Sequence, residues 1–231
     1  VNPQQKDYAW GTVKLIKWMN YGGKENAGLL YLPENYDTSK RYPVIVNFYE
    51  THTEGLHEYV VPTWSSGMLN VVSYVSNGYV VFMPDIHFTV GAPGESCYDA
   101  VVSGTQWLID NGIADKDRIG IQGHSWSGYQ VAYLVTRTNM FACASPGAAV
   151  SSMVSAYTGI RAGSGMPRMF MYEETQSRLG KSLWEDKEMY LRHSPILNAD
   201  KIQTPLLIFH CDKDEAVPYS EGLNLFLAMR R

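Results

Sequence analysis

Residues 119–135 constrain the fold more than any other part of the chain. A short apolar strand enters the motif Gly-x-Ser-x-Ser-Gly at residues 123–128, and a helix with apolar periodicity leaves it. A serine at so tight a strand-to-helix turn sits on strained backbone with its hydroxyl exposed. Small residues are needed on both sides because neighbouring backbone comes very close. The segment therefore predicts an exposed serine at the end of a buried strand.

Ser125 is the candidate nucleophile of this motif. Gly123 fills the small position before it, and Ser127 followed by Gly128 stands where a glycine is usual. Ser127 is the weaker candidate, because the residue two before it is not a glycine. The alternative is a surface turn that is merely rich in serine and glycine, since the bare pattern is weak; the flanking strand and helix favour the functional interpretation.

Buried strands and helices alternate along the rest of the chain. Residues 13–18 and 29–32 predict a hairpin. Continuous apolar runs indicate strands covered on both faces, and periodic runs indicate helices. The pattern predicts a mostly parallel, doubly wound α/β sheet with helices on both faces and a ligand site beyond the strands' carboxyl ends. The expected strands are 44–49, 79–83, 141–145 and 206–210, turn residues stand at 91–94, and the expected helices are 64–76, 97–110 and 221–229.

Length and composition exclude several classes of protein. A chain of 231 residues is long enough for one large α/β domain. The net charge of −4 and the absence of a basic stripe argue against nucleic acid as a partner. The three cysteines, Cys97, Cys143 and Cys211, lack metal-binding spacing, so we expect no metal and no cofactor. No apolar run reaches membrane-span length. The compartment stays open.

The first residues, 1–6, contain neither an initiator Met nor the apolar core of a signal peptide. We therefore expect the chain to be a piece of a longer protein.

Five stretches together resemble the C-terminal catalytic domain of the prolyl oligopeptidase family, on its dipeptidyl-peptidase IV and acylaminoacyl-peptidase side. The resemblance covers nearly the whole chain and implies an α/β-hydrolase fold, with residues 1–40 as hairpin and lead-in and residues 41–231 as the core. It implies a serine peptidase acting on short peptides, an N-terminal β-propeller in the parent protein and a possible homodimer. The stretches are Gly28-Leu29-Leu30-Tyr31-x-Pro33, 43–49, Pro84-Asp85, 118–129 and 205–217.

The oxyanion of such a reaction needs prearranged hydrogen-bond donors. The strand-to-helix turn at Ser125, called the nucleophile elbow below, supplies one donor. This donor is the backbone N–H of Trp126, the residue after the nucleophile. The resemblance makes the hydroxyl of Tyr49 the second donor. The alternative for Tyr49 is a strand-end aromatic that only packs.

The resemblance implies a catalytic triad of Ser, Asp and His, in that order along the chain. Its aspartate is expected after the last strand. Alignment with the family motif through His210 and Val217 places it at Asp214, and leaves Asp212 as a loop acid.

The general base is expected one helix and one strand after Asp214, but the chain ends at Arg231. We therefore expect the last strand and helix, and the catalytic histidine, to lie beyond this chain. The chain alone should then be inactive, with residues 206–209 as an exposed apolar edge. The six histidines present are expected to pack or face solvent: His52, His57, His87, His124, His193 and His210.

The resemblance also locates a substrate pocket. Met153 and Ala156 stand where post-proline peptidases carry aromatic residues around the proline ring, so the sequence predicts a broader pocket for small apolar side chains. Met153 and Tyr157 are equally well explained as ordinary core residues. The expected lining is Trp126, Val150, Met153, Tyr157 and Val217.

Two other functions remain open on the same fold. An esterase would be favoured by a His-Gly-Gly-Gly oxyanion loop, and the sequence has none. A non-catalytic binding protein is favoured by the missing base and by Ser127 in a glycine position, since fold alone does not fix function.

Overall fold

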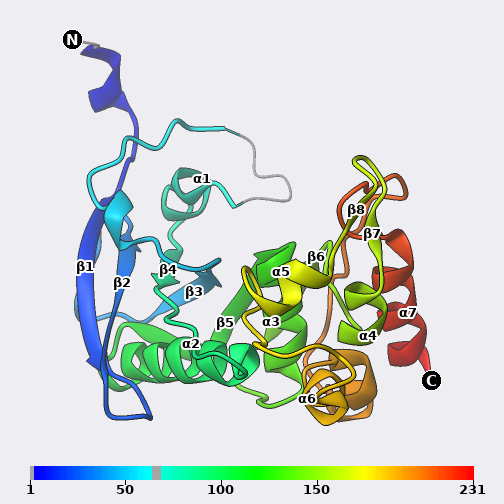
Figure 1. Cartoon of the computed structure of the whole chain (residues 1–231). Helices are drawn as coiled ribbons and strands as arrows, with labels where there is room; N and C mark the ends of the chain where they lie inside the picture. Colours follow the sequence, from blue (N-terminus) through cyan, green and yellow to red (C-terminus); the bar gives the residue numbers. More distant parts are fainter. Residues whose placement is uncertain (1–2, 64–68) are drawn as a thin grey trace.

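The computed structural model describes residues 3–63 and 69–231. Figure 1 shows its elements, with the two termini on opposite sides of the molecule. The strands are β1 (Thr12–Met19), β2 (Glu25–Leu32), β3 (Tyr42–Asn47), β4 (Val80–Pro84), β5 (Ala114–His124), β6 (Cys143–Gly147), β7 (Ile160–Arg161) and β8 (Met166–Pro167). The helices are α1 (Val71–Val75), α2 (Pro93–Asp110), α3 (Trp126–Val135), α4 (Met153–Tyr157), α5 (Met169–Glu173), α6 (Lys187–Arg192) and α7 (Tyr219–Arg230).

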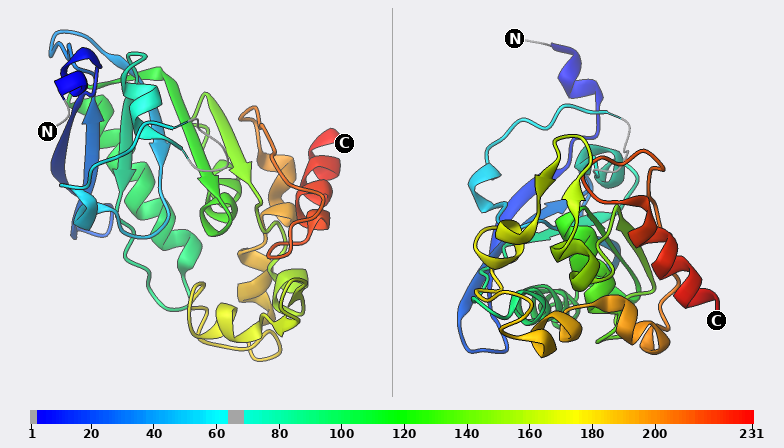
Figure 2. Two further views of the ribbon diagram at one scale, coloured as in Figure 1. Left: turned by 90° about the horizontal axis from the view of Figure 1, so that it is seen from above. Right: turned by 45° about the vertical axis from the view of Figure 1, so that its right-hand side comes forward.

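Six strands form the main sheet in the order β1-β2-β4-β3-β5-β6. The expected hairpin is present, because β1 pairs antiparallel with β2, and β2 pairs antiparallel with β4. The remaining pairs, β4-β3, β3-β5 and β5-β6, are parallel. The left view of Figure 2 follows this order from the blue β1 to the green β6. The predicted mostly parallel sheet is confirmed.

Strand β4 shows why the apolar runs are continuous. Val80 and Phe82 belong to the core cluster that packs with α2, whereas Val81 and Met83 belong to a second cluster with α1. Alternate side chains of a strand point to opposite faces. Both faces of β4 are therefore covered by apolar side chains.

The expected strand at residues 206–210 is wrong in its extent. The structure gives only two single bridges to β6, Ala144 with Leu206 and Gly147 with Phe209, both parallel. Hydrogen bonds occur at both ends of the segment, where Leu207 N–H donates to Ala144 O and Ala148 N–H donates to Phe209 O. Pairing is interrupted between them, so the segment lies beside β6 without being a continuous strand.

Other boundaries also differ from the sequence predictions. The strand expected over 44–49 is observed at Tyr42–Asn47, so Tyr49 lies in the loop after it. Helix α2 begins at Pro93, inside the expected turn, because the fixed φ of proline suits the first position of a helix. Strand β6 lies two residues later than the expected 141–145. The helix expected over 64–76 is observed at Val71–Val75, and its first part, including Met68, lies outside the described residues.

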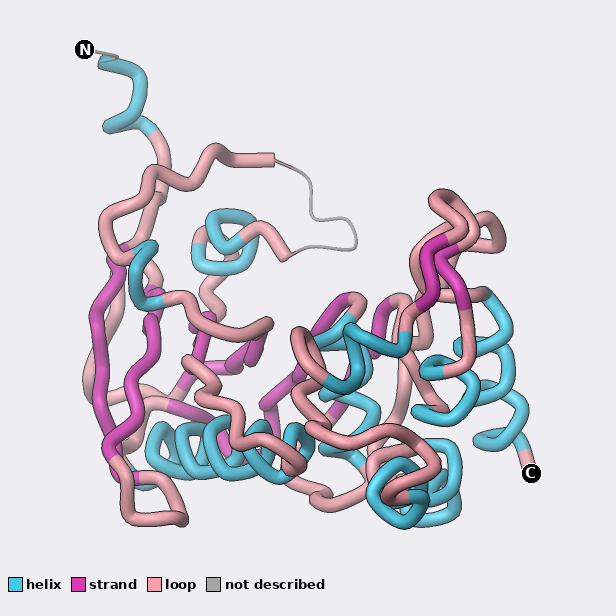
Figure 3. The backbone as a smooth tube through the Cα atoms, viewed as in Figure 1, coloured by secondary structure: helices cyan, strands magenta, loops and turns pink. Residues whose placement is uncertain are grey.

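Residues 148–218 carry short elements on the side of α3 and β6. Figure 3 shows them as short cyan helices joined by pink loops, with β7 and β8 as a small projecting ribbon. They share a third buried cluster with α3, which contains Trp126, Tyr129 and Tyr133. In residues 3–63 and 69–231, no helix has both the length and the apolar character required to cross a bilayer.

Candidate active site

Ser125 occupies the turn between β5 and α3. Its backbone has φ 60° and ψ −116°, a conformation that non-glycine residues rarely adopt. Its N–H donates to Gly147 O at the end of β6, at 2.8 Å. The strand, the strained serine and the helix therefore follow one another as the sequence predicted.

Two glycines make this turn possible. A Cβ atom on Gly123 would lie 2.4 Å from Ser127 O, and one on Gly128 would lie 2.2 Å from Gly147 O. Both contacts are with backbone atoms, which cannot move aside cheaply. The small residues are thus required by close backbone approach on both sides of Ser125.

Ser127 fits the position where a glycine is usual because it bonds within the turn. Its Oγ accepts from His124 N–H at 2.9 Å and donates to His124 O at 3.0 Å. The residue is only 2% exposed. Ser127 therefore closes the turn internally, and Ser125 is the better-placed nucleophile of the two.

The two candidate oxyanion donors belong to the start of α3 and to the loop after β3. Trp126 is the first residue of α3, so its N–H belongs to the helix-terminal groups that have no intrahelical partner. Tyr49 follows β3 and packs against the cluster that contains Trp126. Gln130 of α3 donates to Tyr49 O at 3.1 Å, which ties the tyrosine backbone to the elbow helix.

Asp214 and Asp212 lie in very different environments. Asp214 Oδ1 accepts from the N–H groups of Ala216 and Val217 at 2.8 and 2.9 Å, and its side chain is 17% exposed. Asp212 is exposed, with no hydrogen bond or ion pair of its side chain within the described residues. The ordered carboxylate is that of Asp214, the acid that the alignment selects.

Ser125 and the Asp214 loop leave the sheet at the same edge. His124 is level with Gly147 in the β5–β6 pairing, and Gly147 is level with Phe209 in the next bridge. Ser125 follows the first of these three residues, and the loop 210–217 follows the last. The end of β6 thus separates the two candidate triad members.

None of the six histidines, all of which lie in the described ranges, is hydrogen-bonded to Ser125 Oγ. His193 is fully buried and contacts Glu95 Oε2 at 2.7 Å. His210 contacts Val217 O at 2.9 Å through Nε2, and this nitrogen is 3.8 Å from Asp214 Oδ2. These two histidines stabilise the helices and the acid loop.

The five expected pocket residues lie together in one buried cluster. Val150 and Val217 are 3% and 4% exposed, and Trp126 is 3% exposed and stacks on Tyr129 with ring centroids 4.6 Å apart. Met153 and Tyr157 are more deeply buried, at 0% and 1%. This burial fits the alternative interpretation of Met153 and Tyr157 as core residues.

Sequence reasoning missed the buried carboxylate of Glu221, at the start of α7. Its Oε2 accepts from the N–H groups of Ser151 and Ser152 at 2.8 and 3.0 Å, and from Ser151 Oγ at 3.1 Å. These bonds fix the segment between Val150 and α4, which carries the cluster residues. An isolated glutamate in a helix gives no sequence signal for this role.

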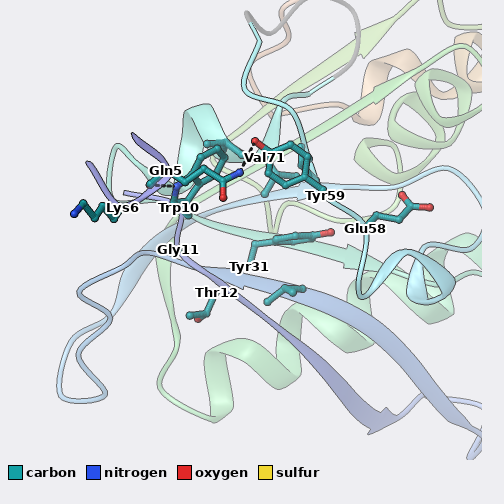
Figure 4. A pocket seen from close by; sticks show the side chains of 12 residues that line it. Gln5, Lys6, Trp10, Gly11, Thr12, Tyr31, Glu58, Tyr59 and Val71 are labelled. Carbon is teal, nitrogen blue, oxygen red and sulfur yellow. Dashed lines mark hydrogen bonds between the residues drawn. The ribbon is translucent and has the colours of Figure 1, made fainter. Parts of the chain in front are cut away.

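A separate cavity of about 430 Å³ lies near the N-terminus. Figure 4 shows Trp10, Tyr31 and Tyr59 around it, with Glu58 at its margin. None of the predicted catalytic, oxyanion or pocket residues lines this cavity. It is therefore distinct from the elbow. Among the described residues, no three His, Cys, Asp or Glu side chains are grouped to hold a metal ion.

Comparison with known proteins gives the same assignment for most of the chain. The sequence model of the prolyl oligopeptidase family matches residues 64–231. Dipeptidyl-peptidase 5 of Porphyromonas endodontalis is 25% identical over 93% of this chain and 31% of its own length. Dipeptidyl-peptidase 5 of Aspergillus oryzae is 28% identical over 88% of this chain and 28% of its own. The chain thus spans about a third of the length of these relatives.

Solved structures share the fold. The acylaminoacyl peptidase of Pyrococcus horikoshii matches with a TM-score of 0.75 and 17% identity, over 100% of this chain and 37% of that one. Dipeptidyl peptidase 4 of Porphyromonas gingivalis matches with a TM-score of 0.73 and 19% identity, over 98% and 31%. These matches confirm the α/β-hydrolase fold. Because the family model covers most of the sequence, the chain belongs to the prolyl oligopeptidase family.

Proposed function

We propose that this chain is the catalytic part of a serine peptidase that hydrolyses short peptides. The observation that carries the proposal is the strained Ser125 between β5 and α3, held by two glycines at which a Cβ atom would overlap the backbone. The named relatives are peptidases, which supports a peptide as the substrate. Ser125 Oγ attacks the scissile carbonyl in this proposal.

The carbonyl oxygen becomes an oxyanion that accepts from Trp126 N–H and the Tyr49 hydroxyl. Such donors act because they are already oriented when the charge develops, and loss of one typically costs about 10²–10³ in kcat. Asp214 orients the general base. Its two backbone hydrogen bonds hold the carboxylate in one place, which supports that assignment.

The base itself is proposed to be a histidine outside residues 1–231, because none of the six histidines here is bonded to Ser125 Oγ. The short share of the relatives that the chain spans is consistent with a longer parent protein. The family resemblance adds an N-terminal β-propeller and a possible homodimer to this proposal. Residues 1–231 alone should then turn over peptides very slowly.

The substrate side chain is proposed to lie against Trp126, Val150 and Val217. The family resemblance puts Met153 and Ala156 where post-proline peptidases carry aromatic residues, so a range of small apolar residues should be accepted. Met153 and Tyr157 would then support this wall from behind. Peptide libraries varied at the residue before the scissile bond would measure the preference.

The test is turnover of short peptide p-nitroanilides by the full-length protein and its Ser125→Ala variant. Loss of the nucleophile of a comparable triad costs on the order of 10⁶ in kcat. Ser39→Ala, at an exposed serine whose hydroxyl bonds to Asp37, is the matched control and should keep most of the activity. Equal turnover by wild type and Ser125→Ala would reject the proposal, and cleavage of esters without any cleavage of peptides would favour an esterase.

A further inference from the structure

A glutamine far away in the sequence contacts the hydroxyl of Tyr49. Gln176 Nε2 donates to Tyr49 Oη at 2.9 Å, across 127 positions of the chain. An amide nitrogen has no lone pair to offer, so the tyrosine oxygen must be the acceptor in this bond. The proton of the Tyr49 hydroxyl is then left free to point at another group.

The segment that carries Gln176 is firmly held. Ser177 and Leu179, which follow it in sequence, are buried, and their N–H groups donate to Met171 O and Tyr172 O at 3.0 and 2.8 Å. Gln176 itself is half-buried. Its amide is therefore presented to Tyr49 from a fixed backbone.

A charged pair fastens the same segment beside Tyr49. Arg178 donates to both carboxylate oxygens of Glu50 at 2.9 and 3.2 Å, and to Gln176 O at 2.8 Å. Arg178 has φ 49°, a strained conformation for a residue with a side chain. Its guanidinium also lies 5.2 Å from the ring centroid of Phe88. Glu50 adjoins Tyr49 in sequence, so the ion pair joins the two segments next to the hydroxyl bond.

We infer that Gln176 is a positioning residue for the oxyanion hydroxyl, and that the Arg178–Glu50 ion pair holds it in place. This inference rests on the proposed function of Tyr49. A hydroxyl at the end of a loop side chain stabilises an oxyanion well only if its proton already points at the developing charge. Gln176 occupies the tyrosine lone pair and leaves the proton for the substrate.

The experiment measures kcat and KM of the full-length protein with a peptide p-nitroanilide. Gln176→Ala should lower kcat by about 10- to 100-fold with little change in KM, because the bond matters in the transition state. Gln176→Glu should be at least as harmful, because a carboxylate only accepts and would draw the tyrosine proton to itself. Gln106→Ala, which removes a half-buried glutamine of α2 bonded to Asp110, is the matched control and should leave kcat unchanged.

A double-mutant cycle separates positioning from a general structural role. In the Tyr49→Phe background, Gln176→Ala should reduce kcat by less than about 2-fold, because the hydroxyl it positions is gone. An equal loss in both backgrounds, or wild-type kcat for Gln176→Glu, would overturn the inference. Ser125→Ala distinguishes failure of the proposed function from failure of this inference. If Ser125→Ala stays active, the proposed function fails. If Ser125→Ala is inactive and Tyr49→Phe is slow while Gln176→Ala is normal, the inference alone fails.

Discussion

At the scale of single residues, the turn at Ser125 requires two residues without a side chain, Gly123 and Gly128. Gly128 leaves room for Gly147 O, and Gly123 leaves room for the carbonyl of Ser127. Ser127 stands where a glycine is usual, and its hydroxyl bonds to both the N–H and the C=O of His124. The sequence pattern shows where small residues are needed, but only coordinates show that this serine satisfies the same requirement by hydrogen bonding.

Gly128→Ala should destabilise the fold by about 1–3 kcal/mol, because the new methyl group would overlap a backbone oxygen and force α3 away from β6. The measurement is the urea midpoint of unfolding. Gly22→Ala is the control: a methyl group there would meet only the side chains of Asp99 and Asn20, at 3.3 and 3.4 Å. Equal midpoints for Gly128→Ala and wild type would contradict this account of the turn.

At the scale of elements, a buried imidazole joins the C-terminal end of α6 to α2. His193, which directly follows α6, bonds to Glu95 in the first turn of α2, and Arg192 pairs with the other oxygen of the same carboxylate at 3.1 Å. Burial alone would raise the pKa of the Glu95 carboxyl, but the hydrogen bond and charge of His193 outweigh it. With a smaller contribution from Arg192, they lower this pKa to about 2.

Because the folded-state pKa lies below its usual value of 4.5, ionised Glu95 stabilises the fold above about pH 4.5. That contribution should be lost progressively as the pH falls toward 2. The difference in urea midpoint between wild type and Glu95→Gln should therefore stay constant from about pH 6 to about pH 5 and shrink below about pH 4.5. Glu188→Gln on α6, an exposed carboxylate without an ion pair in the described ranges, is the control. A difference that grows on acidification would contradict the assignment.

Elements of the fold were predictable where a local pattern determines them. The β1–β2 hairpin, the buried β4, the elbow and α7 follow from apolar periodicity and turn residues. The start of α2 was misplaced because Pro93 and Gly94, typical of a turn, begin a helix. Strand β6 was placed two residues early because its last residues are Pro146 and Gly147. The contacts of Gln176 with Tyr49 and of Glu221 with Ser151 were not predictable. They join segments at least 70 residues apart, and neither residue belongs to a local motif.

At the scale of the whole molecule, one edge of the sheet exposes apolar side chains. Leu207 is 71% exposed and Phe209 is 48% exposed, beside β6. Leu207 also lines a groove of about 330 Å³ with Ile121 and Cys143. An exposed apolar edge with free backbone groups favours pairing between molecules.

Residues 1–231 produced alone should therefore self-associate through this edge. Leu207→Lys should raise the fraction of monomer, because a charge on an edge opposes pairing. Sedimentation velocity over a range of concentrations gives that fraction. Leu197→Lys, at another leucine that is 58% exposed, is the matched control and should change it little. Equal effects of the two substitutions would assign association to general surface hydrophobicity.

The most direct test of the central claim is to map the site at which a fluorophosphonate probe modifies the full-length protein. Such probes react only with an activated serine, so the account predicts a single covalent adduct on the peptide that contains Ser125. Ser125→Ala should abolish the adduct, and Ser127→Ala should keep it. Modification at another serine, or no adduct in a full-length protein that cleaves peptides, would contradict the assignment of Ser125 as the nucleophile.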